Sequence, residues 1–163
     1  MVMVFGLMLG FAEGDDRAVA ACEVARGWGD QPAGPDRIPL KPARLEHLAN
    51  PDRTPFTLME VIPDRFPYKI DAAGYTELGH ALYARLPELV GYQAAMVGWE
   101  IDTFVTAQDL REDWSDEVIR GEVYGLVLSD VILREFPGAE GFVPFAPGYS
   151  WIRYRGETHS DRA

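Results

Sequence analysis

The first apolar run of the chain covers residues 2–11 (VMVFGLMLGF), where apolar residues occupy nearly every position. A strand that is apolar on both faces is typical of the centre of a sheet or of a swapped strand, so we expect a strand here. The run is too short to span a membrane, no basic segment precedes it, and acidic residues follow it. We therefore expect no signal peptide and a cytoplasmic protein.

The next segment has the spacing of an amphipathic helix. The acidic pair Asp15 and Asp16 suits a helix N-terminus, and Gly27 and Gly29 end the pattern. Its expected apolar stripe consists of Ala18, Val19, Cys22 and Ala25. Cys22 is the one cysteine of the chain, which excludes an internal disulfide and favours a small buried hydrophobe over a reactive thiol.

A second helix is predicted to start at Asp71 and to be limited by Pro87. Its apolar positions recur at three- and four-residue steps, at Tyr75, Leu78, Leu82 and Leu86. Between the two helices, residues 29–55 hold six prolines, so we expect a surface connection with one helical turn around Arg44–Leu48.

Two further segments, residues 56–62 (FTLMEVI) and 93–101 (QAAMVGWEI), have the apolar content of strands. Thr106 and Asp109 have the spacing of a capping box, which predicts a short acidic helix over Ala107–Trp114.

Residues 116–136 are ambiguous. Gly121 and Gly125 disfavour a continuous helix, since each costs about 1 kcal/mol relative to alanine. We therefore favour a strand over Glu122–Leu128 and then a short helix capped near Ser129 or Asp130 and stopped by Pro137-Gly138. One helix over 116–136 is the alternative.

Strands and helices are thus mixed without regular β-α-β alternation. This predicts a single α+β domain over 1–163, with an antiparallel or mixed sheet, two to four helices mainly on one face, and a frayed tail at 157–163.

The charge of the chain is acidic and uneven. The 163 residues carry a formal net charge of −11, of which residues 1–70 contribute −2 and residues 71–163 contribute −9. Nucleic-acid binding and binding to anionic membranes both need a basic footprint, so neither is expected. A basic protein partner is what this charge favours.

Residues 141–157 (GFVPFAPGYSWIRYRGE) are dense in aromatic side chains. Phe142 and Phe145 are expected to form one arm of a hairpin around the Ala146-Pro147-Gly148 turn. Alternation along the other arm places four residues on one face, namely Tyr149, Trp151, Arg153 and Arg155. Either this face is a binding surface, or the rings fill the core while the arginines project at its edge.

The expected acidic helix provides a second candidate surface. At helical spacing, Asp109, Glu112 or Asp113, and Asp116 share a face. Such a face is either simply solvated or a surface for a basic partner. A metal site is not expected, because the D-x-[DN]-x-[DN]-G pattern is absent.

Glu100 and Asp102 are two residues apart on the expected strand and point the same way. They could act as acid and base on an anionic substrate that Arg153 and Arg155 hold. The three histidines form no metal-ligand pattern, and no nucleotide, hydrolase or redox motif is present, so no cofactor is expected.

The function that the sequence favours is a protein-interaction module, of the inhibitor or immunity type, that binds a basic partner through an acidic surface. The enzyme or small-molecule binder described above is the alternative. A homo-oligomer that pairs through residues 2–11 or through the terminal strand is a further alternative.

Overall fold

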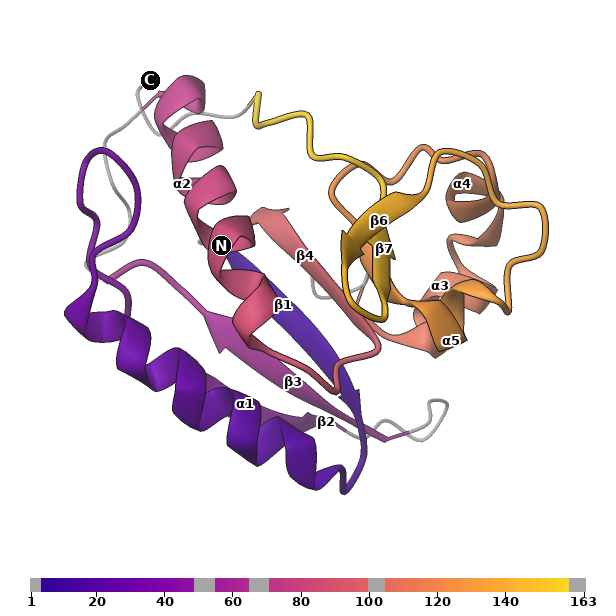
Figure 1. Ribbon diagram of the computed structural model, residues 1–163, viewed down its shortest axis with the longest axis horizontal. Coiled ribbons are helices and arrows are strands. Elements are labelled where there is room, and N and C mark those ends of the chain that lie inside the picture. The colour runs from indigo at the N-terminus through magenta and orange to yellow at the C-terminus, as the bar shows by residue number, and fades with distance from the viewer. Residues whose placement is uncertain (1–3, 49–54, 65–70, 100–104, 159–163) are drawn as a thin grey trace.

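The computed structural model describes residues 4–48, 55–64, 71–99 and 105–158. The chain forms a seven-stranded antiparallel sheet with helices packed against it, which confirms the predicted α+β class (Figure 1). The strands, in chain order, are β1 (Phe5–Ala12), β2 (Arg44–Leu48), β3 (Phe56–Val61), β4 (Ala94–Trp99), β5 (Val127–Ser129), β6 (Val143–Ala146) and β7 (Tyr149–Trp151). Their order in the sheet is β2-β3-β1-β4-β5-β7-β6.

The helices differ in length. The two long ones are α1 (Asp16–Arg26) and α2 (Ala72–Arg85); the short ones are α3 (Ala107–Glu112), α4 (Ser115–Ile119) and α5 (Asp130–Leu133), with 3-10 turns η1 (Gly27–Asp30) and η2 (Leu86–Glu88). Within the described ranges, no helix has the length and apolar character needed to cross a membrane.

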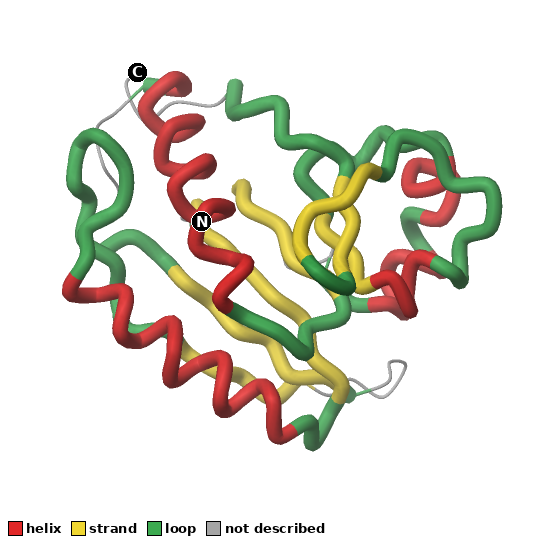
Figure 2. The backbone as a smooth tube through the Cα atoms, viewed as in Figure 1, coloured by secondary structure: helices red, strands yellow, loops and turns green. Residues whose placement is uncertain are grey.

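Strands β1 to β4 and helices α1 and α2 form a split β-α-β arrangement with the strand order of ferredoxin-like folds. Strand β1 lies between β3 and β4, as its two apolar faces predict. Figure 2 shows α1 and α2 against this four-stranded part of the sheet, with the short helices beyond it.

The alternation of side chains along β1 supplies two cores on opposite faces. Leu7 and Leu9 belong to the cluster that α1 and α2 cover, whereas Met8 belongs to a second cluster with Leu110 of α3 and Val118 of α4. The sheet is therefore covered on one face by the long helices and on part of the other by the short ones.

Both long helices start where the sequence predicts. The Asp15 and Asp71 side chains cap α1 and α2 by accepting hydrogen bonds from the backbone N–H groups of Arg17 and Gly74. The stripe predicted on α1 was wrong at Val19, which is 58% exposed, because Ala21 takes the buried position instead.

The proline-rich stretch holds more structure than the sequence predicts. Arg44–Leu48 is the edge strand β2, paired with β3, so the predicted helical turn was wrong. A backbone hydrogen bond from the Lys41 N–H to the Ile62 carbonyl precedes this pairing. The stretch also contributes buried side chains to the main core, at Ala33, Ile38, Leu40 and Ala43.

Residues 116–136 are not one helix, so that alternative was wrong. Helix α4 ends at Ile119, Gly121 and Gly125 adopt positive φ angles of 70° and 86°, and β5 follows. The favoured prediction of a strand followed by a short helix is correct in order, but the strand was predicted over Glu122–Leu128 and lies at Val127–Ser129. Ser129 caps the following helix α5, as expected.

Strands β6 and β7 form the predicted hairpin. Strand β7 ends at Trp151, and the chain then crosses towards α2 (Figure 1). Gly79 of α2 permits this crossing, because a Cβ there would lie 2.4 Å from the Tyr154 hydroxyl. The C-terminal segment, residues 152–158, thus joins the hairpin to the first helical layer.

Candidate functional site

The sheet diverges between β4 and β5, which pair through two residues of each strand, Ala94 with Leu128 and Ala95 with Val127. Next to this point the Tyr83 hydroxyl accepts a hydrogen bond from the Val97 N–H at 3.0 Å. A pocket of about 400 Å³ opens here, within the size range of small-ligand sites. We call it the Glu157 pocket; it is lined by Met96, Trp114, Glu117, Glu122, Val123, Tyr124, Gly156 and Glu157.

The Glu157 pocket is lined by residues from both segments in which the sequence predicts a site. Trp114 and Glu117 come from the acidic segment, and Gly156 and Glu157 come from the C-terminal segment. Arg155 connects these regions to the pocket wall, because its guanidinium carbon lies 3.9 Å from the centroid of the Tyr124 ring. The structure therefore brings parts of both segments to one pocket, but the site residues predicted in each segment lie outside its lining.

Two of the three carboxylates in the pocket share a cation. Arg120 Nε and Nη2 donate to Glu122 Oε1 and Oε2 at 3.1 and 3.3 Å, and Arg120 Nη2 lies 4.0 Å from Glu117 Oε1. The hydrogen bond to Glu122 raises the pKa of Arg120, so the guanidinium keeps its charge. One positive charge thus faces two negative charges.

Glu157 is the third carboxylate, and it has a different environment. Its Oε2 accepts a hydrogen bond from the Tyr154 hydroxyl at 2.9 Å, and its backbone N–H donates to Thr76 Oγ1 at 2.8 Å. Burial raises the pKa of Glu157, while the Tyr154 hydrogen bond acts in the opposite direction. Among the described residues, no cation lies within ion-pairing distance of Glu157.

The acidic segment does not form the continuous face that helical spacing predicts. Asp109 is 3% exposed, and its carboxylate accepts a hydrogen bond from Thr106 Oγ1 at 2.8 Å. Thr106 Oγ1 in turn accepts from the Asp109 N–H, so the predicted N-cap at Thr106 is confirmed, and the surface role predicted for Asp109 was wrong. A polar side chain that is turned in to cap its own helix cannot face a partner.

The other predicted acidic residues stay at the surface. Glu112, Asp113 and Asp116 are exposed, although they do not lie on one helix, because α3 ends at Glu112 and α4 begins at Ser115. We define the acidic surface as Glu112, Asp113, Asp116, Glu117 and Glu122. It adjoins the Glu157 pocket, since Glu117 and Glu122 belong to both.

The predicted binding residues of the terminal strand divide into two groups. Trp151 is half-buried and packs edge-on against Phe145 and Tyr83, with ring centroids 4.8 and 5.1 Å apart, whereas Arg153 and Arg155 are exposed. Tyr154 also packs against Tyr83, at 5.0 Å. The predicted alternation beyond Trp151 was wrong, because the strand ends there.

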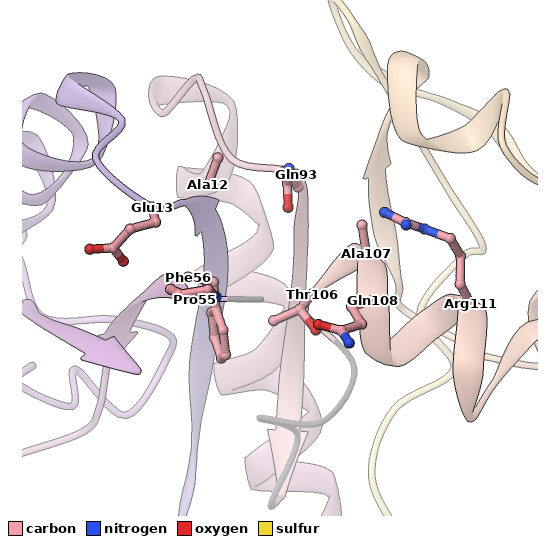
Figure 3. Close-up of a pocket in the computed structure, with 9 residues that line it drawn as sticks. All are labelled: Ala12, Glu13, Pro55, Phe56, Gln93, Thr106, Ala107, Gln108 and Arg111. Carbon is pink, nitrogen blue, oxygen red and sulfur yellow. The ribbon is translucent and has the colours of Figure 1, made fainter. Parts of the chain in front are cut away.

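A larger pocket, of about 500 Å³, lies where the ends of β1, β3 and β4 meet α3. Figure 3 shows Glu13 and Arg111 at opposite sides of it, with Gln93 and Thr106 between them.

Side chains at the rim of this larger pocket already have partners. Glu13 lies 3.7 Å from His47 Nδ1, and Arg111 Nε lies 3.1 Å from Glu135 Oε2. Charges that are separated and paired in this way do not converge on a ligand, so the Glu157 pocket is the better candidate.

Other sequence candidates have different outcomes. Glu100 and Asp102 lie outside the described residues, so their acid–base role stays a prediction. Over the described ranges, no group of three His, Cys, Asp or Glu side chains is placed to hold a metal ion.

The sequence predicts a site role for none of the eight residues that line the pocket, and four that carry its chemistry are Met96, Glu122, Tyr124 and Glu157. They come from three separate segments, so no local spacing relates them. Glu157 was assigned to a frayed tail, and this was wrong, because its backbone is bonded to Thr76. The Arg-Gly-Glu sequence at 155–157 was the available signal, since glycine permits the positive φ of 91° at Gly156.

Comparison with known proteins gives no match: no family model, no curated protein and no solved structure is similar to this chain at a significant level.

Proposed function

We propose that this protein is an interaction module that binds a basic protein partner through the acidic surface. The observation that supports this is the continuity between the acidic surface and the Glu157 pocket, which share Glu117 and Glu122. A partner can therefore meet exposed carboxylates and a recess at one place.

Exposed carboxylates act on such a partner mainly through long-range attraction. Three members of the acidic surface, Glu112, Asp113 and Asp116, are exposed, and no basic residue lies between positions 112 and 119. Complementary charge raises the association rate of a basic partner and is screened over about 8–10 Å near physiological ionic strength. Binding should therefore weaken as salt is added.

The experiment compares three forms of the immobilised protein, each exposed to a lysate of its source at low and high salt. The test variant is Asp113→Ala with Asp116→Ala. The matched control is Asp30→Ala with Asp36→Ala, which removes two exposed carboxylates far away in sequence, around the end of η1.

We expect the wild type and the control to retain a basic protein at low salt and to release it at high salt. The test variant should retain at least about fivefold less of this protein than the wild type does at low salt. Equal retention by all three forms, or retention of no basic protein, would contradict the proposal.

The alternative of an anionic substrate has less support. Arg155 is engaged by the Tyr124 ring, and the neighbouring pocket carries carboxylates, which repel anions. The predicted routes to a homo-oligomer were wrong, because β1 is already paired with β3 and β4 and the terminal strand β7 with β5 and β6. Whether copies associate in another way stays a prediction that a solution mass measurement tests.

A further inference from the structure

The walls of the Glu157 pocket suit the apolar part of a ligand and a positive charge together. Met96 and Val123 contribute apolar surface, and Trp114 and Tyr124 contribute aromatic rings. The Tyr124 ring already holds one cation, because the Arg155 guanidinium lies over it at 3.9 Å. Aromatic rings beside carboxylates are a recurring arrangement for the recognition of organic cations.

The three carboxylates of the pocket outnumber the two neighbouring guanidinium groups, Arg120 and the ring-bound Arg155, by one negative charge. Glu117 and Glu122 share Arg120, whereas the contacts of the Glu157 carboxylate are limited to the neutral Tyr154 hydroxyl among the described residues. A half-buried carboxylate without a cationic partner loses solvation that an incoming positive group would compensate. Glu157 lines a recess of about 400 Å³, which is large enough for an alkyl chain.

The geometry at Glu157 selects the kind of cation. Its Oε2 is engaged by Tyr154, which leaves Oε1 as the open oxygen. A guanidinium binds best to both oxygens of a carboxylate through its planar fork, whereas an ammonium group is a compact charge that a single oxygen can satisfy. An ammonium group on an alkyl chain therefore fits better than an arginine side chain.

We infer that the Glu157 pocket binds an alkylammonium group. Two sources share this chemistry: the side chain of a lysine on the basic partner, which rests on the proposed function, and a free small amine, which does not.

The test is a titration of the full chain, followed by amide nuclear magnetic resonance. The probes are n-butylammonium, n-butylguanidinium, and a short peptide with one lysine, paired with the same peptide carrying ε-acetyl-lysine. Saturable shifts are expected at Met96, Tyr124 and Glu157 with n-butylammonium and with the lysine peptide.

Three variants locate the binding. Glu157→Gln keeps an acceptor for Tyr154 and should weaken n-butylammonium binding about tenfold, and Tyr124→Leu should also weaken it. Glu13→Gln removes a carboxylate from the larger pocket and should leave binding unchanged. The amide spectrum of each variant reports in the same experiment whether it is folded.

Each outcome has a definite meaning. The inference would be overturned if neither n-butylammonium nor the lysine peptide gave saturable shifts at the pocket. It would also be overturned if Glu157→Gln bound n-butylammonium as tightly as the wild type does, or if n-butylguanidinium bound as tightly as n-butylammonium. If amine binding depends on Glu157 and Glu157→Gln also lowers retention of the basic protein, the source is a lysine.

If amine binding depends on Glu157 while retention of the basic protein is unchanged, the ligand is a free amine. The pocket inference then stands even when the Asp113 and Asp116 variant shows that the proposed function is wrong.

Discussion

The Tyr83 hydroxyl donates a 2.7 Å hydrogen bond to the carbonyl oxygen of Gly125, 42 residues further along the chain. The same hydroxyl accepts from the Val97 N–H, so one phenol links α2 to both β4 and the turn before β5. Burial raises the pKa of Tyr83, which keeps the phenol protonated and able to donate. This side chain joins the two sides of the diverging sheet beside the Glu157 pocket.

Removing that hydroxyl should destabilise the fold. Tyr83→Phe leaves a buried carbonyl and a buried N–H without their partner, so we expect a loss of about 1–3 kcal/mol in the free energy of unfolding. Chemical denaturation measures it. Tyr124→Phe is the control, because it removes the hydroxyl of an exposed tyrosine and should change stability by less than about 0.5 kcal/mol. Equal effects of the two changes would contradict the role assigned to Tyr83.

Gly10 should tolerate no side chain. It lies in β1 where the segment leading to α3 crosses closely, and a Cβ there would lie 1.8 Å from the Val105 carbonyl oxygen. Gly10→Ala is expected to lose about 3 kcal/mol, at the upper end of overpacking effects. Gly27→Ala is the matched control: this residue has φ of −65° and nothing within 4 Å of its Cβ position, so it should be neutral or up to about 1 kcal/mol more stable. Thermal or urea unfolding of both variants checks the difference.

The elements that the sequence predicts correctly are those that a local pattern determines. Both long helices have an N-cap aspartate and periodic apolar residues, and β1 is apolar on both faces because it lies in the centre of the sheet. Strand β2 was missed, because Arg44–Leu48 lies at the edge of the sheet, is mostly exposed, and lacks the alternation of apolar and polar residues that marks a strand. Its strand conformation depends on its pairing with β3.

The candidate site was less predictable, for a related reason. The acidic segment and the terminal segment were both recognised, but nothing local relates Glu117 to Glu157. Their meeting depends on the crossing of the C-terminal segment over Gly79, which in turn depends on tertiary packing. Asp109 was misassigned because a capping-box carboxylate and a surface carboxylate have the same helical spacing.

Cys22 should be unreactive in the folded protein. It is 2% exposed, its thiol donates to the Ala43 carbonyl oxygen at 3.4 Å, and burial raises its pKa. A thiol reagent at neutral pH should therefore modify Cys22 at least about a hundredfold more slowly in native protein than in denaturant, at the rate of local or global opening. The absorbance of the released chromophore measures both rates. Rapid stoichiometric reaction in the native state would show that the packing of α1 against the core does not cover the thiol.

Glu157 should make stability depend on pH in a defined direction. Burial raises the pKa of Glu157 in the folded state above its value in the unfolded state, so the folded protein holds this proton to higher pH. The contribution of Glu157 to the free energy of unfolding therefore falls as pH rises from the unfolded pKa through the folded pKa. Glu157→Gln removes this titration while it keeps an oxygen that can accept from Tyr154.

The stability of Glu157→Gln relative to the wild type should consequently increase between pH 4 and pH 7, as measured by urea unfolding at each pH. Glu140→Gln, which removes an exposed carboxylate before β6, shows what the loss of one negative charge does by itself. A difference between Glu157→Gln and the wild type that stays constant across this range would show that the folded state does not disfavour the Glu157 carboxylate. A saturating amine should reduce the difference at pH 7, because a cation bound beside Glu157 stabilises the ionised form of the wild type and has no equivalent effect in the glutamine variant.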